Sequence, residues 1–201
     1  MSLHIFALNP AFYIFQSLTD ILKYRPEYKV ELLDISAEAL GQGYVSETEF
    51  DRCLKNNNHI CFIALKNSMV VGYTLLEIFD VSELKTAFNF DIYDTILSER
   101  DVKQVCYRKH TVVRKEFRNH GTGKALVRFS HRQIEAQVDC IFSLVWKNES
   151  NIMIKILEKE GFNQKLTLPD YWRESSLERR FSCPLCGIPC RCEAVLMVRY
   201  G

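Results

Sequence analysis

The stretch Arg118-Asn119-His120-Gly121-Thr122-Gly123-Lys124-Ala125 decides the fold, and the β-branched run Thr111-Val112-Val113 comes shortly before it. Together they predict a strand, a tight glycine turn and a helix that begins near Gly123. Gly121 and Gly123 have no Cβ, so the backbone can turn sharply and approach a bulky anion. The helix that follows directs its free N–H groups and the positive end of its dipole toward that anion. The sequence therefore predicts a phosphate or pyrophosphate site at this turn.

Two common phosphate-binding loops do not fit this stretch. A Walker A loop needs glycine at the position of Arg118 and Ser or Thr at that of Ala125. A Rossmann fingerprint needs a third glycine where Leu126 stands. The pattern Arg-x-x-Gly-x-Gly after a strand instead resembles the acetyl-coenzyme A loop of the GNAT acetyltransferase superfamily.

A second landmark supports the resemblance. Residues 156–162, Ile-Leu-Glu-Lys-Glu-Gly-Phe, are similar to the end of the family's helix before its sixth strand. The resemblance covers roughly residues 28–200 and implies an α/β (α+β) fold with a mixed, mostly antiparallel central sheet of about seven strands flanked by helices. We expect an N-terminal helical extension at residues 1–27 and a GNAT-like domain at residues 28–201 with a Cys-rich loop at 183–192.

Apolar spacing predicts the local elements. An i, i+3, i+4 stripe over residues 10–25 predicts a helix that Pro26 ends, and residues 28–35 are interpreted as a strand. Ser46 and Glu49 fit a capping box at the start of a helix. The other expected strands are residues 59–66 and 69–79, which form a hairpin, and residues 104–113, 140–146, 164–168 and 193–200.

The resemblance implies that acetyl-CoA is the cosubstrate and places it on particular residues. The backbone of Val113 would contact the pantetheine arm, and its N–H would stabilise the thioester oxygen as that atom becomes negative. Ser150 or Asn151 stands near the position of a family asparagine. The implied coenzyme-binding residues are Val112, Val113, Arg118, Asn119, His120, Gly121, Thr122, Gly123, Lys124, Ser150 and Asn151.

Acetyl transfer to a primary amine by direct attack on the thioester requires a proton acceptor, because an alkylammonium has a pKa of ~10. Glu77 and His110 are the candidate catalytic residues, and the pKa of histidine suits that role. A histidine in a strand is more often structural, and Glu77 fits an outward-facing position equally well. Many family members have a tyrosine general acid where this chain has Leu157, so the acid stays unassigned.

Two functions remain open at this point. The first is an acetyl-CoA-dependent N-acetyltransferase whose acceptor is a small-molecule amine, an amino acid, a peptide N-terminus or a protein lysine. The second is a catalytically silent CoA-binding module with a Cys-rich interaction loop, which the absence of a tyrosine at Leu157 favours. The family resemblance is compatible with a homodimer.

Cys183, Cys186, Cys190 and Cys192 lie within ten residues. The first pair, Cys-Pro-Leu-Cys-Gly, has the form of a zinc knuckle. Zinc ribbons place the second pair ~15–20 residues away, so this short spacing strains a single tetrahedral site. Reduced surface thiols and a disulfide are the alternatives to zinc. A bound zinc ion would be structural, because four thiolates leave no open position.

Composition limits the class of protein. The chain has 201 residues, 47% of them hydrophobic, and a formal net charge of +1. That length suits one domain with a sizeable core. Interleaved acidic and basic residues argue against a nucleic-acid or membrane partner. No apolar run approaches the ~20 residues that span a bilayer, and a cytoplasmic location is expected.

Overall fold

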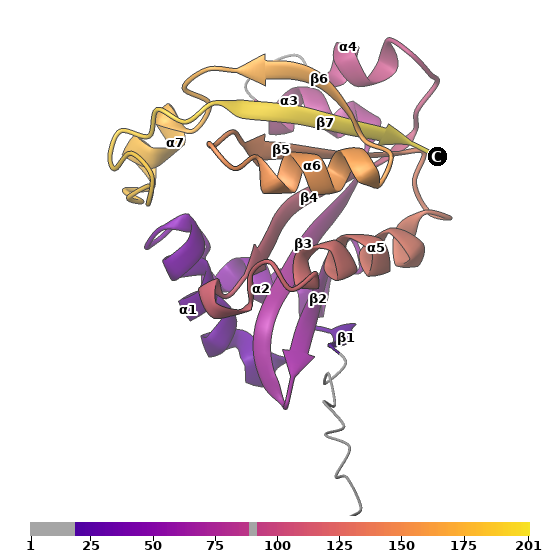
Figure 1. Cartoon of the computed structure of the whole chain (residues 1–201). Helices are drawn as coiled ribbons and strands as arrows, with labels where there is room; N and C mark the ends of the chain where they lie inside the picture. The colour runs from indigo at the N-terminus through magenta and orange to yellow at the C-terminus, as the bar shows by residue number, and fades with distance from the viewer. Residues whose placement is uncertain (1–18, 89–91) are drawn as a thin grey trace, which may run out of the picture.

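The computed structural model describes residues 19–88 and 92–201. In that part of the chain, seven strands form one sheet with helices on both faces (Figure 1). The strands are β1 (Asp20–Lys23), β2 (His59–Lys66), β3 (Met69–Asp80), β4 (Gln104–Val113), β5 (Cys140–Trp146), β6 (Asn163–Leu168) and β7 (Ala194–Tyr200). The helices are α1 (Lys29–Leu40), α2 (Glu47–Lys55), α3 (Leu84–Ala87), α4 (Ile92–Leu97), α5 (Thr122–Ile134), α6 (Ile152–Lys159) and α7 (Arg173–Glu178).

The sheet has the strand order β1-β2-β3-β4-β5-β7-β6. All neighbouring pairs are antiparallel except β4 and β5, which are parallel. The predicted fold class, a mixed and mostly antiparallel sheet of about seven strands flanked by helices, is therefore confirmed. The predicted hairpin is also present, and its turn residues Asn67 and Ser68 have φ of 50° and 63°, the left-handed conformation that two-residue hairpin turns need.

The parallel strands separate soon after they meet. β4 and β5 pair only from Val105 to Tyr107 and from Cys140 to Phe142. Beyond that point the Ser143 hydroxyl donates to the Arg108 carbonyl at 3.0 Å, and the two strands then diverge into a V (Figure 1). The mouth of the V lies between the end of α1 and the loop around α7.

A β-bulge in β4 sets which face of the sheet His110 occupies. Leu75 pairs with His110 and Leu76 with Arg108, so Lys109 is an extra residue on β4. A bulge interrupts the alternation of side chains and turns the following residue to the other face. Lys109 and His110 consequently both reach Glu49 of α2.

Two layers of helices bury the two faces. α5 contributes Leu126, Val127 and Ile134 to one face, which it shares with α6. On the opposite face α1 and α2 pack Leu32, Ile35 and Phe50 against β2, β3 and β4. α3, α4 and α7 continue this second layer along β5 and β7.

The strand expected over residues 28–35 is wrong, because this segment begins α1. Leu32, Ile35 and Ser36 are buried at helical spacing, whereas Val30, which an alternating pattern would bury, is 69% exposed. Pro26 begins a short 3-10 turn just before the helix, which suits a residue with a fixed φ and no N–H.

The helix expected over residues 10–25 lies largely outside the described residues. Its described end is a strand instead, in which Ile21 pairs with Ala64 and Leu22 with Ile63. The two side chains join cores on opposite faces of the sheet, which explains why a strand forms there. The sheet therefore begins before residue 28, where the expected domain starts.

None of the described helices is long and apolar enough to cross a membrane.

Candidate functional site

The glycine turn has the backbone shape that its residues predict. Gly121 has φ of +84° and stands immediately before α5, and the adjacent loop residue Asn119 has φ of 64°. Both values lie in the left-handed region, which glycine and asparagine tolerate best. The first turn of α5 therefore leaves its N–H groups directed toward the space in front of the loop.

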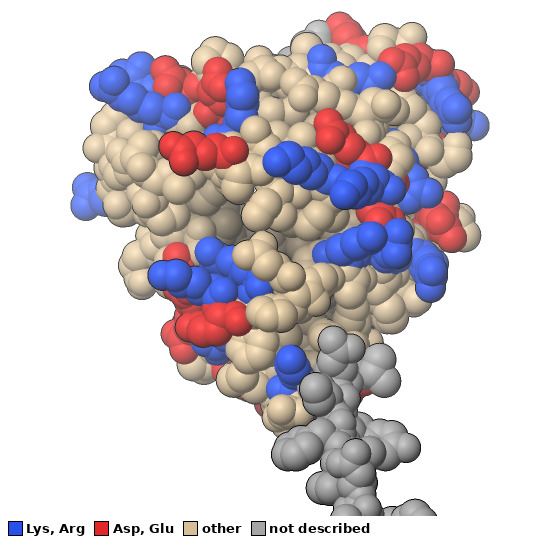
Figure 2. Space-filling view, viewed as in Figure 1, with Lys and Arg blue, Asp and Glu red and all other residues tan. Residues whose placement is uncertain are grey.

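A cavity of about 520 Å³ opens in front of this turn, and we call it the glycine-loop cavity. Figure 2 shows this face hollowed, with Lys and Arg side chains along the lower edge. Eight of the eleven implied coenzyme residues line the cavity: Val112, Val113, Arg118, Asn119, Gly121, Gly123, Lys124 and Ser150. The structure places the other three, His120, Thr122 and Asn151, outside its lining.

The backbone of Val113 faces the gap between β4 and β5. The next residue, Arg114, donates its N–H to the Val71 carbonyl at 2.9 Å. Because backbone groups alternate along an antiparallel ladder, the N–H and C=O of Val113 point away from β3. Its carbonyl accepts a hydrogen bond from Arg118 Nε at 3.0 Å. The Val113 N–H is thus directed to the place where the strands part.

The turn after β5 is held by Asn148. Its Oδ1 accepts hydrogen bonds from the N–H groups of Ser150 and Asn151 at 3.1 and 3.0 Å. Asn148 lines the cavity, whereas Asn151 is the residue immediately before α6, with φ of 47°. In this turn the asparagine that lines the cavity is therefore Asn148, three residues before Asn151.

α6 presents an apolar surface to the cavity. Ile152, Met153 and Ile156 line it, and Leu157 is fully buried in the core beneath α6. The position at which the family resemblance suggests a tyrosine therefore carries no polar atom. These four residues offer no proton donor.

A second cavity of about 200 Å³ adjoins the first, and we call it the histidine cavity because His110 lines it. The two cavities share Leu40, Thr111, Trp146, Asn148 and Met153. Aromatic side chains form much of the second wall, including Tyr44 and Trp172. The separation of β4 from β5 thus produces two adjoining spaces, one beside the glycine turn and one beside His110.

His110 is a buried ring with an unused nitrogen. It is 6% exposed, and its Nε2 has no hydrogen-bond partner among the described residues. The nearest carboxylate oxygen on Glu49 lies 3.9 Å away, beyond hydrogen-bond range. Burial lowers the pKa of His110 from its ordinary 6.5 to about 4. The ring is therefore neutral at pH 7, and its Nε2 is a buried nitrogen that no described residue satisfies.

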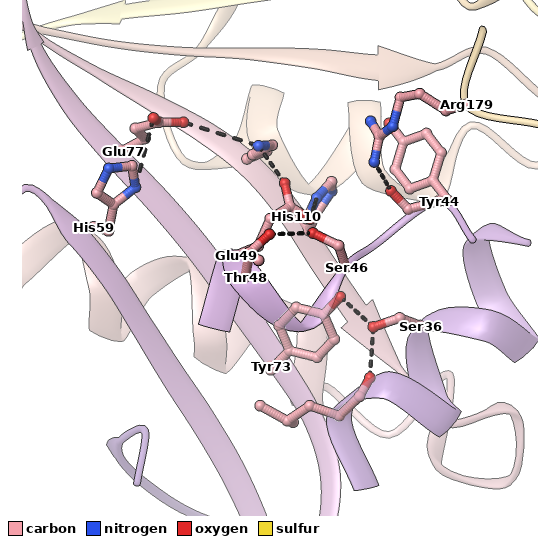
Figure 3. Close-up of polar contacts among 12 residues, drawn as sticks. Ser36, Tyr44, Ser46, Thr48, Glu49, His59, Tyr73, Glu77, His110 and Arg179 are labelled. Atoms are coloured by element: carbon pink, nitrogen blue, oxygen red, sulfur yellow. Dashed lines mark hydrogen bonds and ion pairs between the residues drawn. The ribbon is translucent and has the colours of Figure 1, made fainter. Parts of the chain in front are cut away.

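Glu49 is a functional candidate that the sequence did not reveal. Ser46 makes its side-chain hydrogen bond to the Thr48 hydroxyl, at 2.7 Å, rather than capping α2. The predicted capping box is therefore wrong, and Glu49 instead forms an ion pair with Lys109 beside His110 (Figure 3). Burial opposes ionisation of the carboxyl, but the positive charge of Lys109 stabilises the carboxylate, and the pKa of Glu49 is lowered.

Tyr44 is the second residue that the sequence did not reveal. Its ring lies 5.4 Å from that of His110, nearly edge-on. Arg179 donates to its backbone carbonyl (Figure 3). Burial raises the pKa of Tyr44 well above its ordinary value. The hydroxyl therefore keeps its proton at neutral pH.

Glu77, the other predicted catalytic residue, lies outside both cavities. Its carboxylate is 3.5 Å from His59 Nδ1 and 4.0 Å from Lys109 Nζ (Figure 3). Lys109 thus stands between Glu77 and the Glu49–His110 group. The structure brings His110 to the wall of the histidine cavity and leaves Glu77 in a peripheral ion pair.

Cys183, Cys186, Cys190 and Cys192 come together in space. Their four sulfur atoms all lie within 4.8 Å of one another. The loop that carries them lies between β6 and β7, and its residues Pro184 and Leu185 line the glycine-loop cavity.

No protein-family model and no curated protein sequence matches this chain. Solved structures do share its fold. The structure of NAA60 from Arabidopsis thaliana with a bisubstrate analogue has a TM-score of 0.69 and 13% identity, and covers 92% of this chain and 99% of its own. The ribosomal-protein-S18-alanine N-acetyltransferase of Escherichia coli has a TM-score of 0.63 and 14% identity, and covers 91% of this chain and 94% of its own.

Arylalkylamine N-acetyltransferase 2 from Aedes aegypti gives a TM-score of 0.60 and 15% identity, covering 90% of this chain and 98% of its own. At these identities the comparisons establish a shared fold over almost the whole length of each chain.

Proposed function

We propose that this protein transfers an acetyl group from acetyl-CoA to a primary amine. The observation that carries the proposal is the pair of adjoining cavities where β4 leaves β5. One lies beside an anion-binding helix start and the other beside a neutral buried histidine. Structures of the same fold, NAA60 from Arabidopsis thaliana among them, hold acetyl-CoA.

The glycine-loop cavity takes acetyl-CoA. The N–H groups at the start of α5 bind the pyrophosphate, and Arg118 and Lys124 add positive charge. The apolar residues of α6 contact the pantetheine arm, which brings the thioester to the parting of the strands. There the Val113 N–H stabilises the oxyanion.

The acceptor amine enters through the histidine cavity and attacks the carbonyl carbon of the thioester. A C–N bond forms, and His110 Nε2 takes the proton that the amine loses. Collapse of the tetrahedral intermediate breaks the C–S bond, and the thiolate takes a proton from solvent. The ion pair between Glu49 and Lys109 lies beside the His110 ring and helps to position it. We assign no side chain as general acid.

The alternative is a CoA-binding module without turnover. The apolar surface of α6, where Leu157 stands in place of a tyrosine, favours it. Positioning alone gives large accelerations of bimolecular reactions, so the missing acid does not decide between the two.

The test is thiol release from acetyl-CoA in the presence of a panel of amines. The panel contains peptides with free N-termini and arylalkylamines, because structures of this fold include enzymes named for a ribosomal-protein alanine and for arylalkylamines. Acetyl-CoA with no amine measures background hydrolysis. The transferase predicts release that saturates with one amine class and acetylated product by mass spectrometry. Binding of acetyl-CoA without release on any amine would favour the silent module.

A further inference from the structure

The Cys-rich loop between β6 and β7 begins with a knuckle-like turn. Cys183 and Gly187 exchange backbone hydrogen bonds. The Cys183 N–H donates to the Gly187 carbonyl at 3.3 Å, and the Gly187 N–H donates to the Cys183 carbonyl at 2.9 Å. Gly187 has φ of +75°, a conformation that glycine accepts without strain. This closed turn directs the side chains of Cys183 and Cys186 toward the same point.

The second half of the loop returns the other two cysteines to that point. The Cys190 N–H donates to the buried Ser176 hydroxyl of α7 at 2.9 Å. The Cys192 carbonyl accepts from the Tyr171 N–H at 3.2 Å. The short Cys-x-Cys segment is thus anchored to the residues around α7. This anchoring brings Cys190 and Cys192 to the first pair of cysteines although few residues separate the two pairs.

The separation of the sulfur atoms matches a tetrahedral metal site. Cys183 and Cys192 have Sγ atoms 3.6 Å apart, and Cys186 Sγ lies 3.7 Å from that of Cys190 and 3.5 Å from that of Cys192. Zinc–sulfur bonds of ~2.3 Å in a tetrahedron place sulfurs about 3.8 Å apart. A disulfide would need about 2.05 Å, and all four cysteines are free.

A hydrogen bond in the loop also suits a metal thiolate. The Arg191 N–H donates to Cys186 Sγ at 3.2 Å. Backbone donors of this kind orient ligands and neutralise part of their negative charge. Cys183 and Cys190 are buried, whereas Cys186 is exposed, so an ion can reach the site from solvent.

We propose that Cys183, Cys186, Cys190 and Cys192 bind one zinc ion and that this ion holds a wall of the glycine-loop cavity in place. Four thiolates complete the coordination of zinc and leave no position for substrate. The ion is therefore structural. No step of acetyl transfer passes through it.

The wall is formed by residues next to the ligands. Pro184 and Leu185, between the first two cysteines, line the glycine-loop cavity together with Ala39 and Leu40 of α1. A Cβ on Gly41 would collide with the Ser182 carbonyl, so the loop lies directly on the end of α1. Without the ion this contact would loosen.

The segment that leads into the Cys-rich loop also supports the histidine cavity. Phe181 packs edge-on against Tyr44, with ring centroids 4.8 Å apart. Tyr44 in turn contacts the ring of His110. The zinc loop therefore supports both cavities at the open end of the sheet. Its effect on acetyl-CoA binding rests on the function proposed above, whereas the metal site itself does not.

Metal content tests the site directly. Protein carrying no histidine tag is dialysed against metal-free buffer, and its zinc is measured by mass spectrometry. We expect about one zinc per chain in the wild type and a loss of most of it in Cys186→Ala, whose exposed side chain can be removed without opening the core. Cys53→Ser is the matched control, because Cys53 lies outside the cysteine cluster, its Sγ donates to the Glu49 carbonyl, and serine keeps that donor.

Cobalt provides a readout of geometry. Replacement of zinc by Co²⁺ should give the visible absorption of tetrahedral cobalt thiolate in the wild type and in Cys53→Ser. Wild-type protein that contains no metal would overturn the proposal, as would disulfides among the four cysteines. Full zinc retention in Cys186→Ala would overturn the assignment of four ligands.

The supporting role is tested by removing the ion. Stripping zinc with a strong chelator should change the fluorescence of Trp146 and Trp172, which lie beside the loop, and should weaken acetyl-CoA binding at least tenfold. Adding zinc should restore both. Unchanged fluorescence and affinity in zinc-free protein would overturn the role in the cavity wall. Wild type that contains zinc and binds no acetyl-CoA would refute the proposed function while leaving the metal site intact.

Discussion

His110 combines a buried position with a free nitrogen, a combination that costs stability and needs compensation. Its Nε2 lacks a protein partner among the described residues, and the ring lines the cavity next to the glycine turn. A buried polar atom without a partner costs about 1–3 kcal/mol. A ligand that supplies the missing hydrogen bond would recover this free energy.

Replacing His110 should damage catalysis more than binding. We expect His110→Gln to lower kcat by about 100-fold or more, because general base catalysis contributes at least that much. The Kd for acetyl-CoA should change little, since His110 does not line the glycine-loop cavity. Steady-state kinetics and calorimetry measure the two effects separately.

His59→Gln is the matched control for this variant. His59 pairs with Glu77 and lines neither cavity. Its replacement should leave kcat within about twofold of the wild type, far less than a lost general base costs. Equal loss of kcat in both variants would contradict the assignment of His110.

The buried histidines also predict how stability changes with pH. Burial lowers the pKa of His110 to about 4 and that of His131 to about 3. Between these values and the ordinary 6.5, the unfolded chain binds protons that the folded protein does not. The free energy of unfolding should therefore fall as the pH drops from 6.5 toward 4.

The contribution of His110 can be isolated by urea unfolding at pH 7 and pH 4.5. Between these two values the wild type should lose about 2–3 kcal/mol more than His110→Gln, from 1.36 kcal/mol for each unit of pKa difference. Equal losses in the two proteins would show that His110 is protonated in the folded state at pH 4.5.

Glu49 shows why a residue's role can escape the sequence. Ser46-x-x-Glu49 fits a capping box, and that local explanation accounts for both residues. Only the docking of α2 against the bulge in β4 brings the carboxylate to Lys109 and His110. The bulge has no sequence signature here, so neither this contact nor the face occupied by His110 could be predicted.

At the level of elements, α1 closes one side of the mouth of the V. Leu32 and Ile35 lie on its buried face. Its last residues, Ala39 and Leu40, line the glycine-loop cavity. The sequence predicts a strand at the start of this segment because Val30 and Leu32 alternate with charged residues. The segment forms a helix because this conformation places Leu32, Ile35, Ser36 and Ala39 on one face.

A pair of alanine variants tests this arrangement. Leu32 is fully buried, and Leu32→Ala should lower the free energy of unfolding by about 2–5 kcal/mol. Val30→Ala, at a position that is 69% exposed, should change it by less than about 0.5 kcal/mol. Urea unfolding measures both. A larger cost at Val30 than at Leu32 would contradict the helix.

Other elements follow from the sequence because local and global signals agree. The hairpin of β2 and β3 has an apolar run on each side of Asn67-Ser68. β5 is apolar except at Ser143 and lies inside the sheet, between β4 and β7. Glycine and asparagine mark the turn before α5, where positive φ values are needed.

At the level of the whole molecule, the site arises from the separation of β4 and β5. Three paired positions hold the two strands together, and beyond them the sheet opens into two adjoining cavities. The length of this pairing depends on tertiary packing, so sequence periodicity indicates both strands without indicating the gap. The convergence of four cysteines over the same opening depends on the anchoring of their loop by α7.

The central claim is that the glycine-loop cavity binds acetyl-CoA, and calorimetry tests it with two substitutions at one position. A Cβ at Gly123 would make ordinary contacts with Val113 and Ile156, at 3.7 and 3.8 Å. Gly123→Ala should therefore fold normally, whereas the indole of Gly123→Trp should fill the cavity. We predict a micromolar Kd for acetyl-CoA in the wild type. Folded Gly123→Trp should bind acetyl-CoA at least 100-fold more weakly, and Gly123→Ala should lose less affinity than Gly123→Trp. Absence of binding by the folded wild type, or equal binding by all three proteins, would contradict the account.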